Sequence, residues 1–210
     1  PLLALKNKNY LSDEDMVAYQ KRNLINIKSP NPSVETFLHA FLPFKFVDHT
    51  HSDAIMDVTN RPNGKDLCKK IFGPKVSIVS YIMPGFGLAK KIDEVYSKNP
   101  KINCLILLNH GIFTFDNDAK KSYDLMIKYI SIAEKTVNKI KRKKIKQIKE
   151  YNTKFKPYEI APILRGLLSE NKDQKFILNY RSNKTLNYFI NGKDVKRYSA
   201  IGTATPDHVI

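Results

Sequence analysis

Several features that define large classes of protein are missing from this sequence. No run approaches the ~20 uninterrupted apolar residues of a membrane-spanning helix, which excludes a spanning segment. No charged-then-apolar signal segment opens the chain, so we expect a cytoplasmic protein without a membrane partner. The two cysteines, Cys68 and Cys104, lie far apart in the sequence and do not amount to a disulfide framework.

Arginine is scarce even though the chain is strongly basic. The 210 residues include 36 lysines and arginines against 20 acidic residues, for a net charge of +16, and only six of the 36 are arginine. A basic excess is typical of nucleic-acid binding, but a surface that grips phosphates usually relies on the bidentate fork of arginine. We therefore expect no nucleic-acid partner. The alternative is weak, salt-sensitive binding through a lysine-rich helix over residues 139–149.

The chain opens at Pro1 and not at an initiator methionine, and it stops at Ile210 without a closing signal. We expect an internal fragment of a longer protein. What is present is an ordinary apolar content, 42% of the residues, which supplies a core and argues against disorder. A length near 200 predicts one domain, or one domain with an appendage.

Apolar spacing and turn residues predict alternating helices and strands. Ser33 is expected to cap a helix whose apolar residues recur at intervals of three and four. The expected helices span residues 13–21, 34–44, 65–71, 89–97, 119–151 and 162–169. The expected strands span residues 46–51, 76–82, 102–108, 112–115 and 175–180. The alternation over the first 150 residues indicates a layered α/β domain.

Three of the five histidines stand where a metal site needs them. His49 and His51 flank Thr50 in a predicted strand, so their side chains point to the same face, roughly 7 Å apart along the backbone. His110 ends a buried strand just before a glycine, at the edge where an α/β sheet presents its sites. Three histidines with an open fourth position form a catalytic zinc arrangement. Such an ion polarises a carbonyl oxygen and stabilises an enolate.

Other interpretations of the histidines compete with this one. A His-x-His pair in a strand is more often two surface residues than a ligand pair. His39 is expected to be structural, and His208 to be a loop residue. The run from His49 to Asp53 also begins like the metal motif of the metallo-β-lactamase fold, but Ala54 replaces the next histidine and excludes a dinuclear site.

Two blocks of sequence carry a resemblance to a known family. The first covers residues 32–44 (PSVETFLHAFLPF) and 47–54 (VDHTHSDA), and the second covers 109–115 (NHGIFTF) with Ser122-Tyr123. Together they resemble the class II aldolase/adducin family over nearly the whole chain. Residues 84–86 (PGF) and 204–210 (ATPDHVI) are similar to one branch, the rhamnulose-1-phosphate aldolase half of bifunctional aldolase/short-chain dehydrogenase proteins.

The resemblance implies a three-layer α/β/α class II aldolase-like fold around a mainly antiparallel sheet, present here as an incomplete fragment. It implies a catalytic core over residues 1–151 that lacks its N-terminal part. Residues 152–210 are then a C-terminal extension or linker towards a following dehydrogenase domain. Relatives are commonly tetramers, so a homo-oligomer is expected.

The resemblance also implies roles for individual residues. His49, His51 and His110 are the expected ligands of Zn²⁺ or another divalent metal, and Glu35 is the expected general acid/base. Ser33 matches a position that contacts the substrate phosphate in relatives. The glycine-rich N-terminal region that holds the sugar phosphate in relatives is absent from these residues.

The function implied is metal-dependent cleavage of a ketose 1-phosphate, rhamnulose 1-phosphate by resemblance, to dihydroxyacetone phosphate and an aldehyde such as lactaldehyde. The alternative is a non-catalytic, adducin-like interaction module that shares the fold but lacks the ligand set. Retention of all three histidines together with Glu35 favours the aldolase.

Overall fold

A computed structural model describes residues 1–140, 144–148, 155–169, 176–205 and 208 of the chain. It divides into two compact units, one formed by residues 1–141 together with 203–210, and the other by residues 142–202. Within the described residues, no helix combines the length and the apolar character needed to cross a bilayer.

The first unit is built on a four-stranded sheet in the order β1-β4-β3-β2. Its strands are β1 (Phe46–Thr50), β2 (Val76–Val79), β3 (Cys104–Leu107) and β4 (Gly111–Asp116). Both neighbours of β4 run antiparallel to it, and β2 runs parallel to β3. The expected mixed α/β fold around a mainly antiparallel sheet is therefore confirmed.

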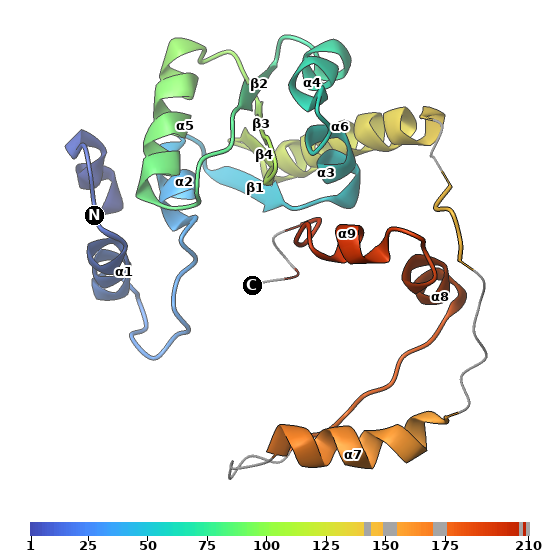
Figure 1. The fold of residues 1–210 in the computed structure, drawn as a ribbon. Helices are drawn as coiled ribbons and strands as arrows, with labels where there is room; N and C mark the ends of the chain where they lie inside the picture. Colours follow the sequence, from blue (N-terminus) through green and yellow to red (C-terminus); the bar gives the residue numbers. More distant parts are fainter. Residues whose placement is uncertain (141–143, 149–154, 170–175, 206–207, 209–210) are drawn as a thin grey trace. The chain divides into compact units, whose positions relative to one another are not determined.

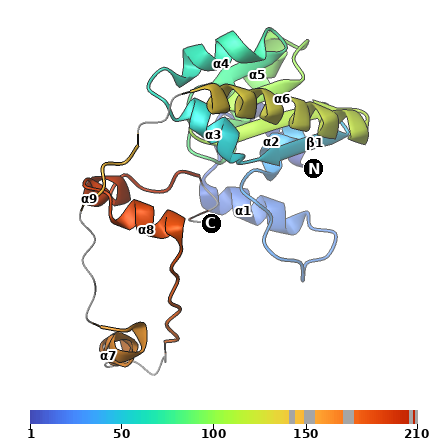
Figure 2. The ribbon, with the colours of Figure 1, turned by 90° about the vertical axis from the view of Figure 1, so that its right-hand side faces the viewer.

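Helices cover both faces of this sheet, as Figures 1 and 2 show. They are η1 (Leu2–Asn7), α1 (Asp13–Arg22), α2 (Thr36–Phe41), α3 (Asp53–Thr59), α4 (Gly64–Phe72), α5 (Phe86–Lys98) and α6 (Ala119–Lys139). Buried residues of η1, α1, α2 and α5 belong to one hydrophobic cluster, and those of α3, α4 and α6 belong to a second.

Strand β3 shows why the sheet needs two covering layers. Its residues are all buried, and they alternate between the two clusters: Leu105 and Leu107 belong to the first, Cys104 and Ile106 to the second. Successive side chains of a strand point to opposite faces, so a continuous apolar run must be covered on both sides. The doubly covered strand expected over residues 102–108 is therefore present, but it is shorter, Cys104–Leu107.

Several predicted boundaries in this unit are wrong. The helix expected over residues 34–44 is only Thr36–Phe41, and the strand expected over 76–82 ends at Val79. The helix expected over 119–151 ends at Lys139, with Ile140 in extended conformation. Residues 144–148 are not helical, while 141–143 and 149–151 lie outside the described residues. The lysine-rich stretch favours a helix by propensity alone, but it offers no apolar stripe to bury.

The second unit consists of three helices and their connections. They are α7 (Pro157–Ser169), α8 (Lys184–Ile190) and α9 (Val195–Ser199). The structure describes every residue of these helices, and none of them is buried. The helix expected over residues 162–169 is present and begins earlier. The strand expected over residues 175–180 is wrong, because residues 176–180 form none; Lys175 lies outside the described residues.

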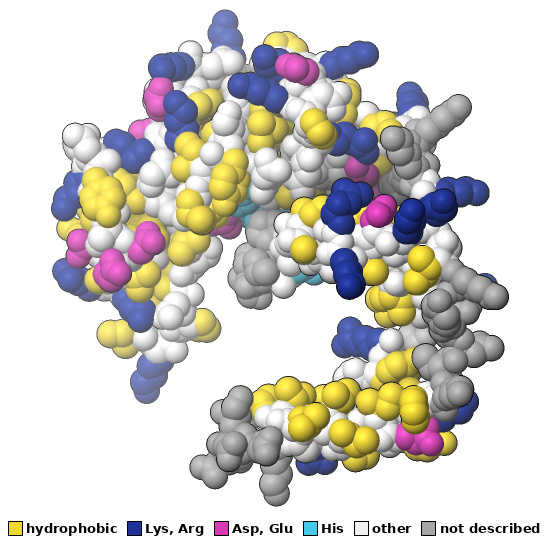
Figure 3. All heavy atoms as spheres, in the orientation of Figure 1, with side chains coloured by type: hydrophobic (Ala, Val, Ile, Leu, Met, Phe, Trp, Pro, Cys, Tyr) yellow, Lys and Arg dark blue, Asp and Glu magenta, His cyan; other side chains and the backbone are white. Residues whose placement is uncertain are grey.

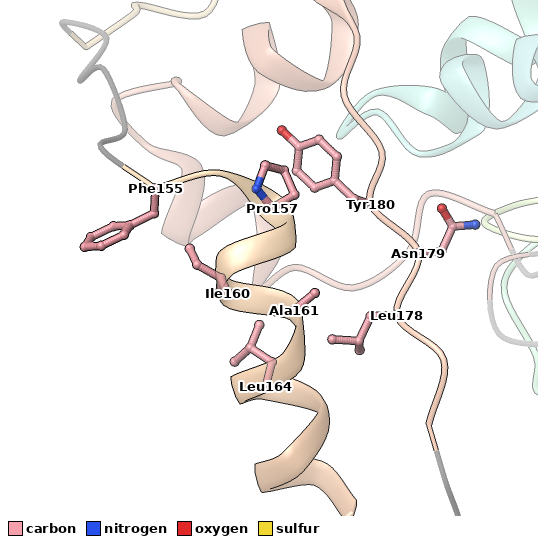
Figure 4. Close-up of a pocket in the computed structure, with 8 residues that line it drawn as sticks. All are labelled: Phe155, Pro157, Ile160, Ala161, Leu164, Leu178, Asn179 and Tyr180. Atoms are coloured by element: carbon pink, nitrogen blue, oxygen red, sulfur yellow. The ribbon is translucent and has the colours of Figure 1, made fainter.

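Figure 4 shows an apolar pocket of about 440 Å³ in the second unit. One wall comes from the first turns of α7 and the other from the segment Leu178–Tyr180. On the face drawn in Figure 3, lysine and arginine side chains are dispersed, whereas hydrophobic side chains gather on α7.

Candidate metal centre and adjoining cavity

Glu35 stands at the entrance of α2, directly before its first residue. The Ser33 hydroxyl accepts a hydrogen bond from the Glu35 main-chain N–H at 3.1 Å, and the Ser33 carbonyl accepts one from Gln20 Nε2 at 3.0 Å. Gln20 is buried on α1, so α1 fixes the turn that carries Glu35. Ser33 was expected to cap the helix. Its side chain instead closes the turn just before it, and Glu35 occupies the N-cap position.

His49 lies near the end of β1, which pairs antiparallel with β4, and His51 follows directly after Thr50, the last residue of the strand, which was expected to reach residue 51. His49 lies opposite Phe113 in the ladder, and their rings stack at 3.9 Å. Nδ1 of His49 lies 2.9 Å from the carbonyl oxygen of Ile112. That carbonyl can only accept, so Nδ1 carries a proton, and in the neutral form of the ring Nε2 keeps its lone pair.

His110 occupies the turn that joins β3 to β4, between Asn109 and Gly111. Asn109 has a φ of 60°, in the left-handed region that asparagine tolerates better than most residues. Gly111 leaves the room that the histidines need. A Cβ placed there would lie 2.6 Å from the Thr50 carbonyl oxygen, and 3.1 Å from a ring carbon of each of His49 and His51. The glycine after His110 is therefore a packing requirement of the site.

These elements bring four metal-ligand side chains together: Glu35, His49, His51 and His110, each with a ligand atom within 4.8 Å of the others. His49 Nε2 lies 3.0 Å from His51 Nε2, and Glu35 Oε1 lies 2.5 Å from His110 Nε2 and 3.3 Å from His49 Nε2. The side chains of His110, His49 and Glu35 are 3%, 10% and 15% exposed. The cluster is therefore largely shielded from water.

The cluster suits a divalent cation by its donor types. Imidazole and carboxylate are the ligands that Zn²⁺ and its neighbours in the transition series take from proteins. The hydrogen bond from His49 Nδ1 to a main-chain carbonyl is the outer contact that fixes a histidine ligand in the correct tautomer. It turns the lone pair of His49 Nε2 towards His51. These four residues could therefore hold a metal ion.

The environment of Glu35 pulls its pKa in two directions. Burial, the largest single influence, raises the pKa of the carboxyl group, whereas hydrogen bonds and positive charge from His110 and His49 lower it. The histidines prevail together, and the pKa of Glu35 lies well below its usual range. The carboxylate is consequently ionised at neutral pH, as a metal ligand or a general base must be.

A cavity of about 750 Å³ adjoins the cluster. Ser33, Glu35, His51 and His110 all contribute to its lining, so Ser33 shares this cavity with three members of the cluster. His39 and His208 do not belong to the cluster, in agreement with the expectation for both. The His39 ring instead packs edge-on against Phe113 at 5.5 Å.

The cavity also has lining residues that sequence reasoning missed, among them Asn60, Tyr81, Asn109 and Thr205. Asn109 belongs to the second block of the family resemblance, which was its one signal. Thr205 belongs to the stretch 204–210, which resembles one branch of the family, whereas Asn60 carried no signal, because a single polar residue after a helix has no diagnostic spacing.

Comparison with protein families gives two matches along the chain. Residues 6–137 match the family described as Class II Aldolase and Adducin N-terminal domain. Residues 155–210 match the one described as Aldolase class II, second domain. Glu35, His49, His51 and His110 all lie within the first match.

Two known proteins are similar to this chain. An uncharacterized oxidoreductase of Bacillus subtilis (strain 168), YuxG, is 36% identical over 213 residues, which cover 98% of this chain and 31% of the relative. The chain thus spans about a third of that protein. The structure of the N-terminal class II aldolase domain of a conserved Thermoplasma acidophilum protein matches with a TM-score of 0.60 and 43% identity. That match covers 65% of this chain and 62% of the other.

Proposed function

The chain belongs to the class II aldolase and adducin family, and from this premise we propose that it is a metal-dependent aldolase. The proposed reaction is cleavage of a ketose 1-phosphate, rhamnulose 1-phosphate in the first instance, to dihydroxyacetone phosphate and lactaldehyde. The resemblance of residues 84–86 and 204–210 to the aldolase half of bifunctional proteins supports this choice of sugar. The relative YuxG is longer than this chain and is named an oxidoreductase, which agrees with the chain being one half of a bifunctional protein.

One observation carries the proposal: three imidazoles and a carboxylate converge within 4.8 Å at the wall of a cavity. We assign His49, His51 and His110 as ligands of Zn²⁺ or another divalent ion. When bound, such an ion supplies Lewis-acid polarisation of a ketone and stabilises negative charge on its oxygen. Neutral imidazole is required of each ligand, so metal affinity falls at acid pH.

Glu35 is assigned the proton transfers at the carbon next to the carbonyl. In the cleavage direction the β-hydroxyl group loses a proton, the carbon–carbon bond breaks, and the carbon next to the carbonyl gains a proton. The contact between Glu35 Oε1 and His110 Nε2 holds the carboxylate at the cavity wall. Low exposure limits competition from water. Ser33 is assigned to the substrate phosphate, which its hydroxyl can reach from the same wall.

The test is the metal content of the purified chain, measured by elemental analysis beside single variants. We expect a stoichiometric divalent metal in the parent protein and its loss in His49→Ala and in His51→Ala. His39→Ala is the matched control, because it removes an imidazole outside the cluster and should keep the metal. A parent protein that binds no metal would overturn the aldolase proposal and favour the adducin-like interaction module.

Glu35→Gln separates the two roles open to the carboxylate. We expect this variant to keep its metal and to lose turnover of the sugar phosphate, because an amide cannot transfer the proton. Loss of the metal would instead make Glu35 a ligand, and unchanged turnover would remove it from the mechanism.

The remaining assignments concern the whole protein. We propose that residues 1–151 form the catalytic core and that residues 152–210 extend it towards a dehydrogenase domain. We further propose a homo-oligomer that acts in the cytoplasm on a sugar-phosphate substrate. Size-exclusion chromatography with light scattering tests the oligomer directly.

A further inference from the structure

The cavity beside the histidine cluster has a wall that comes from the far end of the chain. Thr203, Ala204 and Thr205 line it, although Glu35 and His110 on the opposite part of the lining come from much earlier in the sequence. All of these residues belong to the same compact unit. Thr205 is only 4% exposed, whereas residues 201–204 are exposed. The segment Thr203–Thr205 therefore ends in a residue that is packed against the unit.

Two side-chain amides connect this segment to the turn that carries His110. Asn109 Nδ2 donates to Asn60 Oδ1 at 3.1 Å, and Asn60 Nδ2 donates to the Ala204 carbonyl oxygen at 3.0 Å. Asn109 directly precedes His110, and its left-handed backbone aims the amide out of the turn. These two hydrogen bonds connect the turn that carries His110, through Asn60, to the segment Thr203–Thr205; we call this connection the relay.

The orientation of the Asn60 amide is determined by its partners. Its oxygen accepts from Asn109 Nδ2 and, at 3.4 Å, from the Thr59 hydroxyl, while its nitrogen donates to a carbonyl. A flipped amide would set nitrogen against a donor and oxygen against a carbonyl oxygen, so both ends of the relay would fail. Asn60 follows the last residue of α3, which fixes its main chain.

We propose that Asn60 is a positioning residue that pins the segment Thr203–Thr205 across the cavity, so that this segment forms the outer wall of the substrate site. Asn60 acts through Ala204 and does not touch the reacting atoms. The role in substrate positioning rests on the proposed aldolase function, whereas the pinning of the segment does not. Loss of the pin should therefore weaken substrate binding and leave the metal in place.

The test compares Asn60→Ala and Asn60→Asp with the parent chain as purified. Alanine removes both ends of the relay. Aspartate keeps an acceptor for Asn109 but sets a carboxylate oxygen against the Ala204 carbonyl. Asn63→Ala and Asn63→Asp are the matched controls, because Asn63 is an exposed asparagine three residues away whose side chain caps no helix N–H. Hydrogen exchange of the peptide that contains residues 203–205 is measured first, by mass spectrometry.

We expect both Asn60 variants to exchange about fivefold faster in this peptide, the effect of one net hydrogen bond, and the Asn63 variants to match the parent. With the sugar phosphate, KM should rise about five- to tenfold while kcat stays within about twofold and metal content is unchanged. Unchanged exchange in both Asn60 variants would overturn the pin. Faster exchange with an unchanged KM would overturn the positioning role.

The proposal and the aldolase assignment fail in different ways. A parent protein without metal or turnover contradicts the aldolase assignment, and the exchange comparison still decides whether Asn60 holds the segment. A parent protein with metal and turnover, but without an exchange difference, contradicts the pin alone.

Discussion

Residues 1–141 and 142–202 both form helices, but their helices differ in what they bury. Helix α6 buries Met126, Tyr129, Ala133 and Val137 against the sheet and its neighbouring helices. Helix α7 also carries large apolar side chains but buries none, with Ile163 and Leu167 64% and 65% exposed. Among the described residues of the second unit, Gly192 alone is buried.

The difference teaches what an apolar stripe can and cannot specify. Spacing at three and four predicts a helix in both places, and both helices exist. Whether the stripe finds a partner depends on a sheet that can present an apolar face, and among the residues that the structure describes only the first unit has one. The candidate chemistry follows the same division, since all four clustered ligand residues lie in the first unit.

The largest effect is expected on kcat, because the proposed chemistry is assigned to the first unit alone. Glu35→Gln should lower kcat by about 10²–10⁴-fold, the usual contribution of a positioned general acid/base. Glu159→Gln removes a carboxylate from α7 and should leave kcat unchanged. Steady-state kinetics of the two variants checks the comparison. Equal losses would show that the second unit takes part in turnover.

The next largest effect is expected on the free energy of unfolding, where substitutions of apolar residues should act differently in the two units. Leu105→Ala in β3 removes a fully buried side chain and should lower the free energy of unfolding by about 2–5 kcal/mol. Leu164→Ala on α7, where the leucine is 47% exposed, should change it by about 0.5 kcal/mol or less. Urea denaturation measures both. A large loss in Leu164→Ala would mean that the α7 stripe is covered in solution.

Alkaline pH should act on the first unit through three buried groups, Tyr129, Cys68 and Cys104, and burial raises the pKa of Cys104 well above 9.0. Burial raises the pKa of Tyr129 to about 12 from 10.0, and that of Cys68 to about 11 from 9.0. The folded chain thus keeps protons that the unfolded chain releases. Its stability is complete below pH 9 and falls between pH 9 and 12, by about 1–3 kcal/mol.

Single substitutions assign parts of this alkaline loss to Cys68 and Tyr129. Cys68→Ala should reduce the loss between pH 9 and 11, with the contribution of Cys104 remaining, and Tyr129→Phe should reduce the loss between pH 10 and 12. Thermal denaturation followed across this pH range is the measurement. An unchanged profile in both variants would show that other groups govern the alkaline transition.

The smallest effect is expected from the loss of a helix N-cap, which can be compared at two caps of the same geometry. Asp118 accepts from Lys121 N at 2.9 Å at the start of α6, and Asn183 accepts from Leu186 N at 2.8 Å at the start of α8. Asp118→Ala should cost about 1 kcal/mol of the unfolding free energy, because α6 belongs to a cooperative core. Asn183→Ala should lower helix content locally, seen by circular dichroism, without moving the main transition. Equal shifts would show that the units unfold together.

Much of the first unit could be predicted from the sequence, because its signals are local. The apolar run over residues 102–108 contains β3, and the His-x-His pair begins in β1 and ends directly after it, so both local patterns predicted a strand at the right place. The end of α6 could not be predicted, because lysine favours a helix whether or not a partner exists. The strand expected over residues 175–180 also shows the limit of a local pattern. A strand needs a neighbouring strand, and the apolar residues of 176–180 have none among the described residues.

The residues of the candidate site also divide into those that the sequence predicts and those that it does not. The spacing of His49 and His51 placed them on one face, and family resemblance joined Glu35 and His110 to them. Asn60 could not be found this way, because its partners Asn109 and Ala204 are 49 and 144 residues distant. Such proximity is a product of the completed fold.

The pairing of β1 with β4 has a consequence for the order of folding. The contact between His49 and the Ile112 carbonyl joins residues 63 positions apart, whereas β3 and β4 form a local hairpin. Closing the longer loop costs more chain entropy, so the hairpin can form first and the histidine cluster only afterwards. A one-residue slip of β1 would turn His49 to the opposite face. If the proposed metal binds, its uptake during refolding would report the moment at which distant strands reach their correct register.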